Sequence, residues 1–529
     1  MAVNEKLINR ARENAFFYSL LIVAAVFPFS EALVSISAGL LLLQAIVLQS
    51  WNHPGNRKPL NSLFYLTSIF GVYLIGTAFT NDFPFALYEL KKVIFWIIIP
   101  VAIFISPRIN PKKLYAVLGV FVLSVFISSL VFTLKLLLNP SQNPDVRELG
   151  FISHIRFSFQ VILSQIILVW FIWKKPVNIS GKLYALLIPA AIWLFLFLFL
   201  LKSLIGIFAF FGTVSFAILY FILHLKNKKI KYSLITLLIL FVVMPLAFVG
   251  KVAGDYYNFE EVDPAGVDRF TPSGNTYEFD FNNGARENGN LVYLYICHKE
   301  LRQEWNKRSG LKYDDMLNGY PLNVTLIRYL ASLGYRKDSA GVSKLLEKDI
   351  RRIEQGVTNH KFGSFAFSLY PRVYETIWEI DTYIRSGDPN DKSLAQRFEY
   401  FKASFIIIRN NPLFGIGTGN WKIKFEEAYN AINSKLNPDK RASSHNQYLN
   451  YLVKFGLIGF LWIVFALLIP FFRGGHARNF VYLFFLISIG FANLGDSNME
   501  THMGLSFFTF FYCLFFWNSP DEMKRKLYF

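Results

Sequence analysis

The sequence is poor in cysteine, and it lacks the short motifs of several common enzyme classes. Cys297 lies in a polar region and Cys513 in an apolar run, so we expect no disulfide between them. Two distant thiols also cannot build a disulfide framework or a metal cluster. No Walker A, HExxH, CxxC or GxSxG motif is present. Residues 415–420 (GIGTGN) are glycine-rich, but no strand-crossover unit surrounds them, which argues against a dinucleotide site.

Charged residues are also scarce. They make up 17% of the 529 residues, against about a quarter in an ordinary soluble protein, whereas 53% are hydrophobic. The apolar residues fall in long uninterrupted runs, and a bilayer-spanning helix needs about 20 of them. We therefore predict an all-α polytopic membrane protein with about twelve transmembrane helices. The predicted spans are 14–28, 31–49, 61–79, 87–106, 114–138, 151–173, 183–201, 204–225, 231–250, 447–472, 478–494 and 502–518.

Basic residues outnumber acidic ones by 54 to 36, and the formal net charge is +18. They gather in every second break between the predicted spans, for example at Lys112, Lys113, Lys174 and Lys175. Cytoplasmic loops of membrane proteins concentrate Lys and Arg, so this pattern predicts that both termini are cytoplasmic. Because the excess charge is explained by orientation, we expect no binding of nucleic acid.

One break on the opposite side is long. Residues 251–446 carry apolar residues at helical spacing, for example over 291–308, 340–356 and 373–384. We therefore expect three parts: an N-terminal transmembrane bundle of about nine helices (1–250), a mostly helical outer loop domain (251–446) and about three C-terminal transmembrane helices (447–529).

This topology places several ionisable residues on the outer face, where Lys and Arg have no role in orientation. They are His154, Arg156, Lys202, Arg397, Arg409, His445 and Glu500. Guanidinium groups bind phosphate oxygens in a bidentate manner, so an anionic headgroup, especially a diphosphate, is a suitable ligand. The alternatives are that His154 is an interfacial polar residue without a role and that Arg156 reaches membrane lipid phosphates.

The region 397–459 carries several motifs in a fixed order. RFEYFKASFIIIRNNPLFGIGTGNWKIKFEEAY begins at Arg397, and RASSHNQYLNYLVKFGLIG begins at Arg441. An Arg-led amphipathic helix thus precedes a PLFGxGxGN turn, and an HNxYL motif opens a transmembrane helix that continues into GLIG. This arrangement resembles the C-terminal hallmark of the O-antigen ligase and polymerase superfamily. Similarity to Bacteroidota-type versions extends to METHMGLSFFTFF near the end of the chain.

The resemblance implies a GT-C-like enzyme of the bacterial inner membrane, with a periplasmic active site and no cofactor. Its expected donor is a glycan linked to undecaprenyl diphosphate. Because no convincing DxD-type carboxylate pair is present, we expect metal-independent transfer. Direct attack from the face opposite the diphosphate would invert the anomeric centre. At the turn before the eighth span the family often reads SRTG, but this chain has Leu204 after Ser203. The arginine is therefore missing, and Lys202 is the candidate to replace its charge.

Transfer from a diphosphate needs cations at the leaving group and a base for the acceptor hydroxyl. Histidine is the side chain that titrates nearest neutral pH, so His445 is the expected base. Capping or packing of a helix is the alternative role for His445. Arg156 and Arg397 are the expected catalytic cations. The expected substrate-binding residues are Lys202, Arg409, Asn446, Glu500 and His154.

The acceptor stays open. A ligase would use lipid A–core, a polymerase another lipid-linked repeat, and a protein transferase a Ser or Thr. The long helical outer segment favours the ligase. A transporter of lipid or anions is a more distant alternative. Two expectations argue against it: there is no charged residue buried within a span beside an obvious partner, and there is no inverted repeat.

Overall fold

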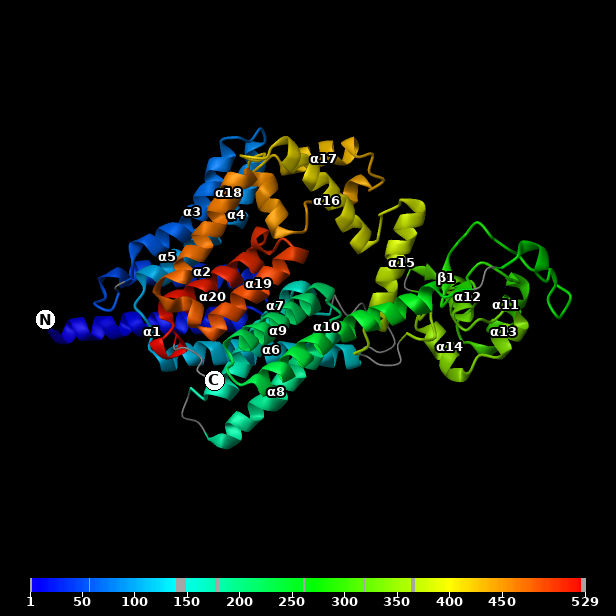
Figure 1. Cartoon of the computed structure of the whole chain (residues 1–529), viewed down its shortest axis with the longest axis horizontal. Helices are drawn as coiled ribbons and strands as arrows, with labels where there is room; N and C mark the ends of the chain where they lie inside the picture. The colour runs from blue at the N-terminus through cyan, green and yellow to red at the C-terminus, as the bar shows by residue number, and fades with distance from the viewer. Residues whose placement is uncertain are drawn as a thin grey trace. The chain divides into compact units, whose positions relative to one another are not determined.

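The computed structural model describes residues 2–56, 58–138, 149–176, 180–259, 262–317, 319–362 and 367–524. This part of the chain is mostly α-helical, as predicted (Figure 1). Its strands form two short antiparallel hairpins. One pairs β1 (Arg286–Glu287) with β2 (Asn290–Leu291), and the other pairs β3 (Met316–Leu317) with β4 (Tyr320–Pro321).

The apolar runs of the sequence form the helices on either side of the predicted outer segment. Before it come α1 (Ala2–Val26), α2 (Glu31–Val47), α3 (Leu60–Thr77), α4 (Phe83–Lys92), α5 (Phe95–Ile105), α6 (Pro111–Leu138), α7 (His154–Lys174), α8 (Gly181–Leu200), α9 (Leu204–His224) and α10 (Lys228–Tyr257). After it come α18 (Gln447–Phe472), α19 (Phe480–Gly495) and α20 (His502–Asn518).

Among the described residues, 6 helices are long and apolar enough to cross a membrane: α3, α6, α7, α9, α10 and α18. Shorter apolar helices are α2, α19 and the part of α8 from Tyr184 to Leu200. The number of twelve spans stays a prediction. The predicted span 87–106 is divided in the structure, because the chain turns at Val93 and Ile94 between α4 and α5.

The chain divides into two compact units. The membrane unit contains Met1–Leu134, Val146–Leu238 and Ser386–Phe529, and the loop unit consists mainly of Ile239–Arg385. Residues 386–446, which the sequence places in the outer domain, thus belong with the membrane helices. They form α16 (Ser393–Asn410) and α17 (Trp421–Ala431).

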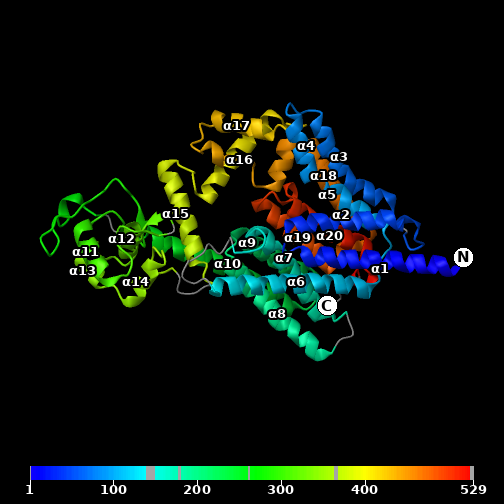
Figure 2. The same ribbon diagram turned by 180° about the vertical axis from the view of Figure 1, so that it is seen from behind.

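In the membrane unit, helices from both ends of the chain pack together. Helix α18 packs on α3, α20 on α5 and α2, and α19 on α7 and α9 (Figures 1 and 2). Aromatic side chains fill the contacts of α20; for example, the Phe511 ring lies 4.7 Å from that of Phe121. Helix α10 is different, because none of its most apolar stretch is buried. Exposed apolar side chains such as Met244 and Leu246 are typical of a surface that faces lipid.

The loop unit has its own core. It is built from α11 (His298–Arg308), α12 (Leu322–Ser332), α13 (Ser339–Ser343) and α14 (Glu347–Glu354), with α15 (Tyr370–Ser386) at its end. Trp305, Tyr313 and Tyr329 are fully buried in this core. A separate apolar cluster joins Tyr374 of α15 to Val252 and Tyr256 of α10.

Helix α18 is kinked at Gly456, which has φ 62°. The kink releases backbone groups from the helix, and the glycine-rich loop between α16 and α17 bonds to them. Leu457 N donates to Pro412 O (2.8 Å), and Gly417 N donates to Lys454 O (2.9 Å). The glycine-rich motif is therefore part of the packing of α18. The approach needs glycine, because a Cβ on Gly456 would lie 2.3 Å from Leu413 O.

We predict that Gly456→Ala destabilises the protein by about 1–3 kcal/mol, because the left-handed conformation and the close loop both exclude a side chain. Thermal unfolding in detergent would measure the change. Gly119→Ala is a matched control, since Gly119 is helical and nothing lies within 4 Å of its would-be Cβ. Equal melting temperatures for the two variants would contradict the role of the kink.

Candidate functional site

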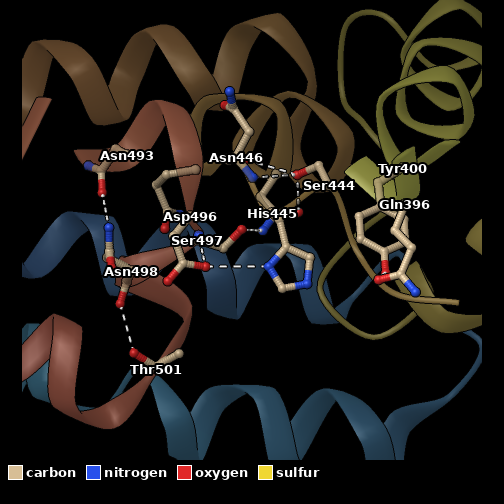
Figure 3. Close-up of polar contacts among 12 residues, drawn as sticks. Gln396, Tyr400, Ser444, His445, Asn446, Asn493, Asp496, Ser497, Asn498 and Thr501 are labelled. Atoms are coloured by element: carbon tan, nitrogen blue, oxygen red, sulfur yellow. Dashed lines mark hydrogen bonds and ion pairs between the residues drawn. The ribbon is translucent and has the colours of Figure 1, made fainter. Parts of the chain in front are cut away.

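His445 lies directly before α18, at the end of the chain segment that precedes the helix. Its Nδ1 is 3.4 Å from Oδ1 of Asp496, which follows α19 (Figure 3). The imidazole stacks on the ring of Tyr400 from α16, with 5.3 Å between the ring centroids. The side chain is 42% exposed, so a substrate can reach it. The backbone of His445 is left-handed, with φ 46°.

Asp496 is the carboxylate partner that the sequence analysis missed. Its side chain is only 13% exposed, and Oδ1 also accepts a hydrogen bond from Ser497 N (2.9 Å). Burial favours the neutral acid, but the hydrogen bond from His445 and the nearby charges of His445 and Arg156 outweigh it. The pKa of Asp496 is therefore below its ordinary value. An ionised Asp496 can only accept a hydrogen bond, so it favours the tautomer of His445 that carries its proton on Nδ1 and leaves the lone pair on Nε2.

The residues around His445 hold it in place. Asn446 caps α18, because its Oδ1 accepts from Tyr448 N (3.0 Å) and Leu449 N (3.1 Å). Its Nδ2 donates to Leu494 O (3.0 Å), which ties the start of α18 to the end of α19. Both the oxygen and the nitrogen of the Asn446 amide thus form hydrogen bonds within the protein, next to the histidine. Substrate binding by Asn446 stays a prediction.

Arg156, in the first turn of α7, lies close to this pair. Its Nε donates to Thr501 Oγ1 (3.2 Å), and its Nη1 is 3.7 Å from Glu31 Oε1. Its charge also acts on Asp496. The structure therefore brings together His445 and Arg156, which are far apart in the sequence, through Asp496. His154 is the first residue of α7 and is half-buried.

The turn with Lys202 lies against the same helices. Ser203 caps α9 by accepting from Gly206 N (3.3 Å), and a Cβ on Gly206 would lie 2.2 Å from Ser158 Oγ of α7. Ile205 packs against Gly495, the residue before Asp496. The Lys202 turn is thus held beside α7 and the end of α19, near the segment that carries Asp496.

The two arginines of α16 have different positions. Arg397 is one turn from Tyr400, the residue that stacks on His445, and its charge acts on the Tyr400 hydroxyl. Arg409 is exposed near the end of the helix, about 14 Å farther along the axis than Tyr400. The structure therefore groups Arg397, but not Arg409, with the histidine.

Glu500 belongs to a buried ionic network. Its carboxylate accepts from Lys454 Nζ of α18 (2.7 Å) and from Tyr73 OH of α3 (2.7 Å). Lys454 is 3% exposed and donates equally closely to Glu89 of α4, which also pairs with Lys92 (2.6 Å). A substrate-binding role for Glu500 stays a prediction, because these buried contacts already engage its carboxylate.

This network corrects one expectation from the sequence. No charged residue was expected to be buried within a span beside a partner, but Lys454 is one, eight residues into α18. No local pattern indicates this pair, because Glu89 lies 365 positions away from Lys454. That argument against a transporter therefore fails, and the choice between transporter and enzyme depends on the site around His445.

Apolar helices suited to a bilayer indicate an integral membrane protein, and its candidate site holds an exposed histidine against a carboxylate. Residues 361–465 match the profile of a family described as O-Antigen ligase. The predicted resemblance is thereby confirmed for this segment, which contains His445.

A comparison with curated proteins gives a partial match. An "Uncharacterized protein" of Haemophilus influenzae is 30% identical over 148 residues, which cover 27% of this chain and 31% of that protein. The chain thus matches about a third of the length of this relative. The match is too short to extend a function from one protein to the other.

We predict that Lys454→Met destabilises the protein by about 3–5 kcal/mol, because it leaves two buried carboxylates with too few cations. Unfolding in detergent would measure the effect. Lys424→Met is the matched control, since it removes a surface pair with Glu427 in α17 and should cost at most about 1 kcal/mol. A Lys454 variant as stable as this control would show that the network contributes little.

Proposed function

We propose that this protein is an O-antigen ligase that transfers a glycan from undecaprenyl diphosphate to lipid A–core at the periplasmic face of the inner membrane. The observation that supports it most is the pairing of His445 with Asp496 beside Arg156. His445 lies in the segment that matches the O-antigen ligase profile, and Asp496 comes from the segment after α19. Arg156, whose charge acts on Asp496, comes from α7.

In the proposed reaction, His445 acts as the general base. Its Nε2 takes the proton of the acceptor hydroxyl while the oxygen forms a bond to the anomeric carbon of the donor glycan. The bond from that carbon to the diphosphate oxygen breaks, and the diphosphate leaves with the electron pair. Attack from the face opposite the diphosphate inverts the anomeric centre. Asp496 orients the imidazole and stabilises the imidazolium that forms.

The leaving diphosphate gains negative charge, and cations held in place beforehand stabilise it. Arg156 is the first candidate, because its guanidinium lies next to Asp496 and is held by Thr501. Arg397 and Lys202 are the further candidates from α16 and from the turn before α9. The reaction in this form requires no metal ion and no nucleotide sugar.

The acceptor distinguishes the proposed ligase from its relatives. The loop unit, with its own packed core, favours a large acceptor such as lipid A–core. A polymerase or a protein transferase would use the same histidine on a different acceptor hydroxyl. The glycan products in cells decide among these acceptors.

We predict that His445→Ala lowers the rate of transfer by about two to four orders of magnitude in a purified assay, because the base is lost. Asp496→Asn should lower it by about ten- to a hundredfold, since the amide can no longer hold the imidazolium electrostatically. His224→Ala is the control, because this exposed histidine ends α9 and bonds and stacks with Tyr220 of the same helix. Near-normal turnover of His445→Ala would contradict the assignment of His445 as the general base.

In the native host, deletion of the gene should leave lipid A–core without long glycan, and the glycan should accumulate on undecaprenyl diphosphate. Wild-type protein should restore the product, and His445→Ala should not. Mass spectrometry of lipopolysaccharide and of the lipid-carrier pool gives both readouts. Core with a single repeat would indicate a polymerase, and unmodified periplasmic proteins with normal lipopolysaccharide would indicate a protein transferase. Unchanged glycans in every fraction would leave transport of a lipid or an anion as the remaining candidate function.

A further inference from the structure

The loop unit contains a pocket of about 530 Å³ beside the β1–β2 hairpin and the turn after α12. Three of its lining residues are cations: Arg286, Arg336 and Lys337. None of the described residues that line it is acidic. Its size is that of a small-molecule site, and its positive charge favours an anion.

Lys337 is the strongest sign of a ligand. The residue is 4% exposed, and its ammonium donates to Leu291 O (2.9 Å). Within the described part of the chain, no carboxylate forms an ion pair with it. Burial lowers the pKa of Lys337 to about 8, because the charge is removed from water without a counter-charge. A buried cation of this kind is stabilised when an anion enters the pocket.

The other two cations are fixed by their neighbours. The Arg286 guanidinium lies over the ring of Phe259, 3.3 Å from its centroid. Arg336 pairs with Asp268, which does not line the pocket, and lies 4.6 Å from the centroid of the Tyr295 ring. Tyr277 engages Arg336 as well, through its ring and its side-chain hydrogen bond. The Arg286 guanidinium, which Phe259 holds on one face, is therefore the better placed of the two to meet a ligand.

The rest of the lining suits a sugar. Tyr295 and Tyr335 line the pocket with aromatic rings, and Asn290 adds an amide that can bond to hydroxyl groups. The amide of Asn288 is already bonded to Ser332 O and to Asn359. The backbone of the wall is fixed as well, because Gly289 has φ 84° and a Cβ there would lie 2.1 Å from Asn258 O. Carbohydrate hydroxyls and an acidic group would therefore find partners in one preformed pocket.

We propose that this pocket binds an anionic sugar, one that carries a carboxylate or a phosphate. All its lining residues belong to the loop unit, whereas His445 belongs to the membrane unit, and the proposal does not depend on glycan transfer. Loss of binding here and loss of transfer at His445 are therefore distinguishable results.

The test uses the full-length protein in detergent and calorimetric titration with three probes: trigalacturonate, mannose 6-phosphate and neutral maltotriose. At least one anionic probe should bind about tenfold more tightly than maltotriose, because charge-assisted hydrogen bonds are lost with the neutral sugar. Arg286→Gln and Lys337→Met should each weaken that binding about tenfold. Lys348→Gln, which removes an exposed charge of α14, should leave it unchanged. Arg286 is half-exposed, so its variant tests the pocket even if Lys337→Met fails to fold.

Inorganic phosphate tests the sugar part of the proposal. It should bind more weakly than mannose 6-phosphate, because it cannot use the aromatic and amide lining. Equal binding of the free ion and the sugar phosphate would overturn the assignment to a saccharide. Equal binding of all three sugars, or a loss in Lys348→Gln as large as in Arg286→Gln, would overturn the pocket as the site.

Discussion

The buried ammonium of Lys454 is the constraint on which the site depends. A charge inside the membrane unit cannot be left without counter-charges, so Glu89 and Glu500 must both stay within hydrogen-bond distance of it. This requirement fixes α18 against α4 and against the segment between α19 and α20. The backbone carbonyl of the same lysine accepts from Gly417, which adds the glycine-rich loop to the assembly. His445 lies two residues before α18 and Asp496 lies four residues before Glu500, so the ionic network also constrains the distance between the histidine and its carboxylate.

The candidate site is assembled from segments that are far apart in the chain. The segment that matches the O-antigen ligase profile contains His445 and Arg397, whereas Arg156 and Asp496 lie outside residues 361–465. The matched residues alone would hold the histidine without the carboxylate that contacts it. Helices outside the match thus complete the candidate site, because α19 packs on both α18 and α7.

The sequence predicted most of the helices because hydropathy is a local property that a run of residues carries by itself. It also pointed to His445 and Arg156, because both lie at helix ends that the topology places on one face. It missed Asp496 and the network of Lys454, since both depend on partners from other segments, and no spacing in the chain indicates them. For the same reason, residues 386–446 were assigned to the outer domain: their helices are amphipathic, and only the packing of α16 and α17 shows that they belong to the membrane unit.

The left-handed backbone of His445 has a consequence for how the protein can evolve. A non-glycine residue in this conformation costs on the order of 1–3 kcal/mol, which the hydrogen bonds of Asn446 and the stacking on Tyr400 must offset. Glycine or asparagine would adopt the same conformation with less strain. Variants selected only for a more stable fold would therefore tend to lose the histidine. Under the proposed mechanism, its retention requires selection for the reaction itself, and stability and activity oppose each other at this position.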